Sequence, residues 1–578
     1  MYILGINAYH GDAAAAIVKD GQLIAAVEEE RFNRFKHSAG FPEQAIRYCL
    51  KEARVGIEDL DHVGISRDPS AHLHKKILFA ATRVASLARS QIKDRLGNAA
   101  RVRDLKDELA RVFEVPKKQL RARFHNVEHH RAHLASCFFV SPFERAALLS
   151  IDGFGDFIST MWGVGQGNSI EVLGQVEYPH STGIVYTATT QFLGFPHYGD
   201  EGKVMGLAPY GQPRFINEFR KIIRTEENGQ FRLNLDYFRH HSEGVEMTWD
   251  HGSPVIGRVY SDAFADLFGP AREAGTPLSD RERDIAASLQ LRLEEISFHV
   301  LNNLHERTGL TDLGLAGGVA YNSVMNGKIL LNTPFKRVYV QPAAGDSGTA
   351  LGVCYQIYNG VLKRERGEVM EGAYTGPQFS NDDVCAALAG SDLRFESYTD
   401  EETTKRAAQD IANGLVVGWF QGRMEFGPRA LGNRSIVVDP RRAEMKDILN
   451  DRIKKREPFR PFAPSILEER VGDYFEQTHP APTMLMVYQI REERRNEIPA
   501  VTHVDGSGRL QTVSRTVNER YYQLISDFAE LTAVPVILNT SFNENEPIVC
   551  TPNEAIECFR KTKMDVLYLG NFAVRRKD

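Results

Sequence analysis

The sequence lacks the features of a membrane-spanning, secreted or disulfide-stabilised protein. No apolar run approaches the roughly 20 residues that a membrane span needs. The chain opens on an apolar strand pattern, without the basic segment and apolar core of a signal peptide, so we expect no such peptide. Its six cysteines form no Cys-x-x-Cys pair, which is typical of reduced, mostly buried thiols in a cytoplasmic protein.

A strong charge imbalance is also missing. The chain carries 70 Lys and Arg against 76 Asp and Glu, a net charge of -6, so we expect no nucleic-acid partner and no anionic membrane partner. Its 42% hydrophobic and 25% charged residues are ordinary for a globular protein. A length of 578 residues predicts two or more domains.

Strand-like runs alternate with helical patterns, which favours an α/β fold. Residues 1–6 and the two runs that flank a turn at 19–22 predict three strands, and residues 280–307 predict a long amphipathic helix. A looser stretch, residues 361–400, predicts a linker between a first domain, residues 1–360, and a second domain, residues 401–578.

Residues 71–124 are predicted to be a mostly helical, basic insertion in the first domain. From Lys75 to Arg123 there are 14 Lys or Arg against 5 Asp or Glu. A solvated helical face explains this pattern best. A basic cap that admits an acidic or large acceptor is the alternative.

Two histidines in a predicted helix, residues 129–140, suggest a metal site. His129 and His133 are four residues apart, so their imidazoles lie one turn apart on one face and can bind one metal ion. Asp152 and Asp346 each follow an apolar, strand-like run beside glycines and are the candidates for further ligands. Such a donor set favours Fe, Zn or Mn. Alone, the spacing is more often that of solvated or core histidines.

Polar and charged residues near the first strand suggest contacts with an anion. The turn at residues 7–12 lies where α/β proteins commonly hold a phosphate. Residues 28–37 are dense in charge, which indicates either a solvated helix end or groups gathered around an anionic substrate.

Two glycine-containing segments further along the chain suggest nucleotide contacts. Lys203 lies among the glycines of residues 199–211, but the spacing is not that of a Walker A loop, and a tight turn explains it equally well. Gly317 and Gly318 precede a predicted helix with asparagines at 322 and 326. A helix cap would explain the glycines but not the second asparagine.

The second domain carries five cations within 38 residues, in loops rich in Gly, Pro and Phe: Arg423, Arg429, Arg434, Lys454 and Arg460. Guanidinium groups in such turns favour a site for phosphate or carbamoyl oxygens over a solvated surface.

Nine motifs, in this order, resemble those of the O-carbamoyltransferases of nodulation-factor and antibiotic biosynthesis. They are Glu-Glu-Glu-Arg-Phe with Lys-His (28–37), His-His-x-Ala-His (129–133), Asp-Gly-x-Gly (152–155), Gly-Lys-x-Met-Gly-Leu-Ala-Pro-Tyr-Gly (202–211), Ala-Gly-Gly-Val-Ala-Tyr-Asn (316–322), Gly-Asp-Ser-Gly (345–348), Gly-Pro-Arg-Ala-Leu-Gly (427–432), Arg-Pro-Phe-Ala-Pro (460–464) and Asn-Thr-Ser-Phe-Asn (539–543). The resemblance covers nearly the whole chain.

The resemblance implies a fold and a reaction. The first domain is expected to have the two-lobed actin/Hsp70/sugar-kinase (ASKHA) fold, and the second to be YrdC-like. Carbamoyl phosphate and ATP (with Mg) would react in the second domain to give carbamoyl adenylate and pyrophosphate. An acceptor hydroxyl of a natural product or sugar would then take the carbamoyl group in the first domain, with release of AMP. Family members suggest a homodimer.

The resemblance also implies roles for individual residues. Fe(II) or a similar divalent metal would be held by His129, His133, Asp152 and Asp346. Lys36 would contact the carbamoyl adenylate. The nucleotide would lie against Gly153, Lys203, Gly317, Gly318, Asn322 and Asn326. Carbamoyl phosphate and ATP would be bound by Arg423, Arg429, Lys454, Arg460, Asn539, Ser541 and Asn543.

The chain departs from the family after its first strand. Many members have His-Asp there, whereas this chain has His10-Gly11-Asp12. We expect His10 and Asp12 to be catalytic, with His10 as the general base if the longer turn still lets it reach the acceptor hydroxyl.

Other functions stay open at this point. A small-molecule kinase on the same first fold would explain the glycine loops but would leave the His and Asp set and the second domain unused. A non-catalytic module that binds nucleotide and metal is a third possibility. A hydrogenase-maturation carbamoyltransferase would need Cys-x-x-Cys pairs, which are absent. Residues 71–124 and 212–275 are expected to shape the pocket for the acceptor.

Overall fold

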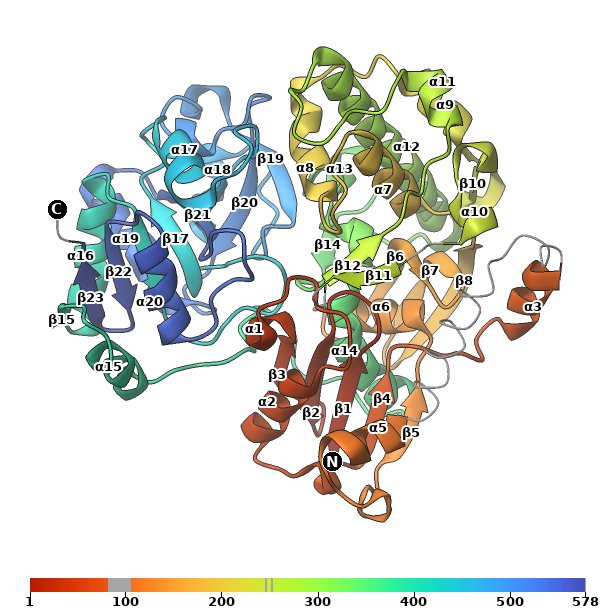
Figure 1. Cartoon of the computed structure of the whole chain (residues 1–578), viewed down its shortest axis with the longest axis horizontal. Coiled ribbons are helices and arrows are strands. Elements are labelled where there is room, and N and C mark those ends of the chain that lie inside the picture. The colour runs from red at the N-terminus through yellow and green to blue at the C-terminus, as the bar shows by residue number, and fades with distance from the viewer. Residues whose placement is uncertain (82–104, 245–246, 251–252, 577–578) are drawn as a thin grey trace. The chain divides into compact units, whose positions relative to one another are not determined.

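The computed structural model describes residues 1–81, 105–244, 247–250 and 253–576. The centre of the expected basic insertion, residues 82–104, lies outside the described residues; before and after it come α3 (Leu73–Ala81) and α5 (Leu105–Val112). The chain divides into two compact units (Figure 1). Unit 1 comprises Met1–Met325 and Ile329–Met370, and unit 2 comprises Asn326–Lys328 and Glu371–Asp578. Within the expected linker, residues 381–389 form α15 (Asn381–Ala389) and residues 395–397 form β15 (Phe395–Ser397).

The first sheet of unit 1 has the strand order β3-β2-β1-β4-β5. Its strands are β1 (Tyr2–Asn7), β2 (Ala14–Lys19), β3 (Gln22–Glu28), β4 (His62–Ile65) and β5 (Arg123–Asn126). β1 runs antiparallel to β2 and parallel to β4. The predicted hairpin at residues 19–22 is confirmed, because Asp20 and Gly21 both have positive φ, 49° and 88°, as a two-residue type I′ turn requires.

The second sheet of unit 1 repeats this arrangement in the order β14-β13-β6-β7-β8. Its strands are β6 (Arg145–Gly155), β7 (Ile158–Gln166), β8 (Ser169–Glu177), β13 (Asp312–Ala316) and β14 (Arg337–Val340). β6 runs antiparallel to β7 and parallel to β13, so it takes the place that β1 has in the first sheet. This duplication agrees with the two-lobed fold that the motifs led us to expect.

Two helices link the sheets at the centre of unit 1 (Figure 1). α6 (His129–Phe138) packs against β6 and β13, α14 (Asp346–Tyr355) packs against β1 and β2, and the two helices pack against each other. Glycine permits this close packing, since a Cβ at Gly352 of α14 would lie 1.8 Å from the carbonyl oxygen of Ala132 in α6. The first residues of the two helices, His129 and Asp346, lie close together, with Nε2 of His129 3.5 Å from Oδ1 of Asp346.

A layer of helices covers the second sheet. The predicted helix at 280–307 is confirmed as α12 (Asp280–Thr308), which starts at a capping box formed by Ser279 and Glu282. It contacts α7 (Thr182–Phe192), α8 (Glu201–Leu207) and α9 (Ile216–Ile222). α2 (Glu43–Ala53) packs on β2 and β3 of the first sheet.

Unit 2 is built on one nine-stranded sheet, β15-β23-β22-β16-β17-β21-β18-β20-β19. Besides β15, the strands are β16 (Val417–Phe420), β17 (Arg434–Val438), β18 (Ala463–Leu467), β19 (Met486–Gln489), β20 (Ser507–Val513), β21 (Val536–Ser541), β22 (Val566–Leu569) and β23 (Phe572–Arg575). The main helices are α16 (Asp400–Ala412), α19 (Glu519–Thr532) and α20 (Pro552–Lys561). In the part of the chain that the structure describes, no helix is both long and apolar enough to cross a membrane.

Candidate functional site

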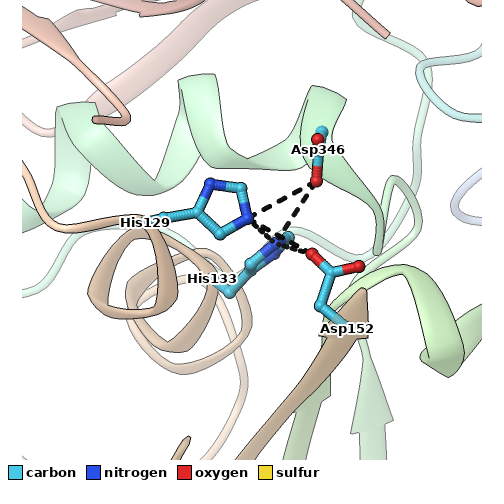
Figure 2. A group of neighbouring side chains, drawn as sticks. All are labelled: His129, His133, Asp152 and Asp346. Carbon is cyan, nitrogen blue, oxygen red and sulfur yellow. Dashed lines mark hydrogen bonds and ion pairs between the residues drawn. The ribbon is translucent and has the colours of Figure 1, made fainter. Parts of the chain in front are cut away.

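Four predicted side chains converge in unit 1 (Figure 2). His129 and His133 come from α6, Asp152 from β6, and Asp346 is the first residue of α14. The Nε2 atoms of the histidines are 3.1 Å apart and lie 3.2 and 3.1 Å from Oδ2 of Asp152. Oδ1 of Asp346 is 3.5 Å from Nε2 of His129 and 3.7 Å from that of His133. The sequence spacing thus located a real cluster.

Backbone N–H groups hold the Asp152 carboxylate of the cluster in place. Oδ1 of Asp152 accepts hydrogen bonds from the N–H groups of Gly153, at 2.7 Å, and Gly318, at 3.2 Å, which leaves Oδ2 to the histidines. Gly317 has a φ of 95°, and a Cβ there would lie 2.2 Å from the carbonyl oxygen of Ile151. Only glycine fits that position. The Gly-Gly turn therefore positions a carboxylate, a role that the sequence did not reveal.

The charges within the cluster are strongly coupled. Burial alone would lower the pKa of His129, but the carboxylates of Asp346 and Asp152 outweigh burial and raise it to about 9. Burial, and after it the negative charge of Asp152, raises the pKa of Asp346. Two carboxylates and two imidazoles in so small a buried space are best neutralised by a shared cation.

The donor set fits a divalent metal. Ligand atoms about 2.1 Å from one tetrahedral centre lie roughly 3.4 Å apart, close to the separations observed here. The four ligand atoms all lie within 4.8 Å of one another. Nδ1 of His129 and Nδ1 of His133 have no hydrogen-bond partner among the described residues. No hydrogen bond at Nδ1 therefore sets which nitrogen of either ring carries the proton. Two nitrogen and two oxygen donors suit Fe(II), Zn(II) or Mn(II).

The predicted catalytic residues lie on loops around this cluster. Nδ1 of His10 is 4.0 Å from Oδ2 of Asp346, and its ring stacks on that of His129 with centroids 5.8 Å apart. Burial, and then the charge of Arg67, lowers the pKa of His10 well below its usual value. Oδ1 of Asp12 is 2.8 Å from Nδ1 of His37, and Lys36 is exposed on the same loop as His37.

The predicted nucleotide-binding residues are more scattered. A Cβ at Gly153 would meet no heavy atom within 4 Å, so there is open space beside it. Lys203 forms an ion pair with Asp200 at 2.9 Å. The Asn322 side chain caps α13 (Ser323–Asn332) by accepting from the N–H of Met325, and its amide also bonds to Gln290. Asn326 is fully buried.

Unit 2 brings three of its predicted residues together. Nζ of Lys454 donates to the carbonyl oxygens of Ser541, at 2.6 Å, and Asn543, at 2.8 Å, and to the Asn543 side chain at 2.7 Å. Asn539, on the same strand as Ser541, donates to the Gln511 side chain at 2.9 Å. The end of β21 and the loop after it therefore fix the position of the buried Lys454 ammonium group.

A group of arginines lies in the same unit. Burial, and then the charges of Arg429, Arg456 and Arg460, lowers the pKa of Arg509 well below its usual range. Burial, and then Arg460, lowers the pKa of Arg456 to about 9. A cluster of cations that lower one another's pKa is a candidate site for an anion. Arg456 and Arg509 were missed in the sequence, because Arg456 stands among other charged residues and Arg509 within a strand.

Two other predicted cations have mainly structural contacts. Arg434 is buried and donates to the carbonyl oxygens of Gln421, Gly422, Asn433, Pro377 and Cys550, with its guanidinium 3.7 Å from the Phe420 ring centroid. Arg423 donates to the carbonyl oxygens of Thr375 and Gly376. Glu425 holds the loop that carries Arg429, because its Oε1 accepts from the N–H groups of Leu431, Asn433 and Arg434.

Both parts of the chain match known families. Residues 2–355 match the family model described as Carbamoyltransferase N-terminus, and residues 408–576 match Carbamoyltransferase C-terminus. An uncharacterized protein of Synechocystis sp. is 42% identical over 608 residues, which cover 100% of this chain and 97% of that protein. Nodulation protein NolNO of Sinorhizobium fredii is 40% identical over 577 residues, 99% of this chain and 80% of that protein. Among solved structures, HypF of T. kodakarensis is weakly similar, with a TM-score of 0.33 and 14% identity over 63% of this chain and 48% of that chain.

Proposed function

The chain belongs to the carbamoyltransferase family and is a carbamoyltransferase, and we propose that it uses ATP to activate carbamoyl phosphate before transferring the carbamoyl group to a hydroxyl. In the first step, carbamoyl phosphate, ATP and water give carbamoyl adenylate, pyrophosphate and phosphate. In the second, the acceptor hydroxyl attacks the carbamoyl carbon and AMP leaves. The acceptor is a small natural product or a sugar.

Unit 2 carries out the activation in this proposal. The arginines at positions 429, 456, 460 and 509 bind the phosphates of carbamoyl phosphate and ATP, which relieves their mutual repulsion. Lys454, held by the loop after β21, adds a further positive charge. Adenylation is needed because a carbamoyl group without a good leaving group is a poor electrophile.

Unit 1 carries out the transfer. His129, His133, Asp152 and Asp346 hold the divalent metal, which would supply a Lewis acid for phosphate oxygens. The Gly317-Gly318 turn keeps the Asp152 carboxylate in place, and the open space beside Gly153 leaves room for the adenylate. Lys36 contacts the adenylate from its exposed loop.

One observation carries the proposal: four side chains from three elements, far apart in the sequence, meet with donor separations of 3.1 to 3.7 Å. A kinase that transfers the γ-phosphate has no need of such a set. The acceptor hydroxyl and the leaving AMP do need charge neutralisation beside the carbamoyl carbon.

The test needs no acceptor. Purified protein is incubated with ATP and carbamoyl phosphate, each also alone, and pyrophosphate, AMP and ADP are measured. We expect pyrophosphate only when both substrates are present. Arg460→Ala should abolish it, whereas Arg470→Ala, which removes an exposed arginine paired with Asp473, should not. Formation of ADP, or pyrophosphate release without carbamoyl phosphate, would contradict the proposal.

A further inference from the structure

An aspartate and a histidine from two separate loops of unit 1 form a pair beside the cluster of His129, His133, Asp152 and Asp346. Asp12 lies in the turn after β1, and His37 lies in the loop after α1 (Glu30–Asn33). Nδ1 of His37 is 2.8 Å from Oδ1 of Asp12. Both residues have left-handed backbone, with φ of 57° and 53°. Such backbone in a non-glycine residue is uncommon and gathers at functional sites.

The surroundings fix the His37 ring. Its backbone N–H donates to Oε2 of Glu30 at 2.8 Å, and Oε1 of Glu30 is 2.9 Å from the guanidinium of Arg31. The edge of the ring contacts Tyr198, with centroids 5.0 Å apart. Gly199 has a φ of 86°, and a Cβ there would lie 2.6 Å from Nε2 of His37, so glycine is required beside the ring. The loops thus hold one orientation of the imidazole.

The second ring nitrogen is available. Nε2 of His37 makes no hydrogen bond to any of the residues that the structure describes, and the side chain is 32% exposed. The carboxylate of Asp12 on Nδ1 favours the tautomer with its proton there, which leaves a lone pair on Nε2. This is the arrangement of an imidazole base oriented by a carboxylate.

We propose that His37, oriented by Asp12, is the general base for the acceptor hydroxyl, in place of His10; this rests on the function proposed above. Nε2 of His37 takes the hydroxyl proton while the acceptor oxygen bonds to the carbamoyl carbon. The bond from that carbon to the adenylate oxygen breaks, AMP leaves, and the proton passes from His37 to solvent. His10 remains next to the Asp346 carboxylate.

Two observations connect the pair with the cluster. Asp12 is two residues from His10, so their Cα atoms are within about 7 Å of each other. Tyr198 connects the two regions, because it packs on His37 and its pKa is raised by burial and then by the charges of Asp12, Asp346 and Asp152. A metal bound by Asp12, Glu30 and His37 is disfavoured, since the Glu30 oxygens already serve Arg31 and a backbone N–H.

The charges around His37 predict the pH dependence. Burial and the charge of Lys36 lower the pKa of His37, Asp12 and Glu30 raise it, and the net effect is a raised pKa. Tyr198 packs against the ring from the opposite loop. A base must be neutral to act, so the transfer rate rises as the pH passes this pKa.

The experiment uses the two simplest acceptors, water and hydroxylamine. The full chain is given ATP and carbamoyl phosphate; pyrophosphate reports adenylate formation, AMP reports its consumption, and hydroxyurea reports trapping by hydroxylamine. His37→Gln should leave pyrophosphate release unchanged and slow AMP release in water by about 100-fold or more. Hydroxylamine, which needs no deprotonation, should restore AMP release. Asp12→Asn should shift the acid limb of the rate profile to lower pH.

His62→Gln is the matched control. His62 also has one ring nitrogen bonded, to His125 at 2.9 Å, but it begins β4, at the opposite end of the sheet from residues 10–12. It should behave as wild type.

Three results would overturn the inference while leaving the proposed function intact: unchanged AMP release in His37→Gln, failure of hydroxylamine to restore it, or a reduced metal content in that variant. If the wild type released no pyrophosphate, the proposed function would fail, and this inference with it.

Discussion

Replacing Gly318 by alanine tests whether the backbone positions Asp152 for metal binding. The N–H of Gly318 donates to Oδ1 of Asp152, and a Cβ at Gly318 would lie 2.8 Å from that same oxygen. Real Cβ atoms essentially never lie within 3.0 Å of a heavy atom outside their own residue and its two chain neighbours. Gly318 is not in the left-handed region, so alanine adds no backbone strain. The Asp152 carboxylate therefore has to move away from the added Cβ.

The size of the effect follows from this distance. Relieving the contact moves the carboxylate by about 0.4 Å, comparable with the roughly 0.5 Å within which a functional site must be held. Loss of the outer support of a metal ligand weakens affinity by about 10- to 100-fold. That range corresponds to about 1.4 to 2.7 kcal/mol of binding free energy.

The assay is competition between the protein and a chelator for Fe(II), repeated with Zn(II) and Mn(II). The control is Gly153→Ala, because a Cβ there meets no heavy atom within 4 Å and the N–H to Asp152 is kept. We expect weaker metal binding in Gly318→Ala, wild-type binding in Gly153→Ala, and similar unfolding of both metal-free variants. Equal metal affinity in Gly318→Ala and the wild type would refute the reasoning that this turn positions a metal ligand.

Three further predictions concern stability. Glu425→Ala should lower the melting temperature and slow pyrophosphate release, because three backbone N–H groups of the loop that carries Arg429 lose their acceptor, at about 1 to 3 kcal/mol for each donor left unpaired; an unchanged melting temperature would contradict this. Arg509→Met should raise the melting temperature without ligand and remove the stabilisation by carbamoyl phosphate, since it deletes one of four mutually repelling cations; thermal shift with and without ligand measures both. His125→Gln should flatten the acid destabilisation between pH 6.5 and about 4. Burial, and then the charge of His62, lowers the folded-state pKa of His125 from 6.5 to about 4, so its contribution is present above 6.5 and is lost as the pH falls; melting curves across this range test it.

The sequence predicted those helices and strands whose ends are marked by turn or capping residues. The hairpin at residues 19–22 has the turn residues that its backbone requires, and the helix at 280–307 has a capping box before it and a glycine after it. The convergence of His129, His133, Asp152 and Asp346 was expected from helical spacing and from strand ends, both local features. These are the cases in which nearby residues decide the structure.

Residues whose role depends on distant partners were missed. Arg509 lies in β20, next to β18, which is next to β21, so its neighbours come from a strand order that does not follow the sequence. The role of Glu425 depends on the folded loop, whose backbone N–H groups reach its carboxylate only in the structure. Gly317 and Gly318 are predicted to contact a nucleotide, and the structure adds a contact that the sequence did not suggest: the N–H of Gly318 donates to Asp152, 166 residues away. No local pattern encodes such pairings.

The duplication of unit 1 gives a reason for two Asp–His pairs with different roles. Asp12 lies in the turn between β1 and its antiparallel neighbour β2, and Asp152 lies near the end of β6, which leads into its antiparallel neighbour β7. Each faces a histidine from another segment, His37 or His129. The Asp152 side gains a second imidazole and a second carboxylate, enough donors for a metal. The Asp12 side has one imidazole whose Nε2 makes no hydrogen bond within the described residues, which is what proton transfer requires. One repeated scaffold can therefore place a metal and a base at neighbouring strand ends.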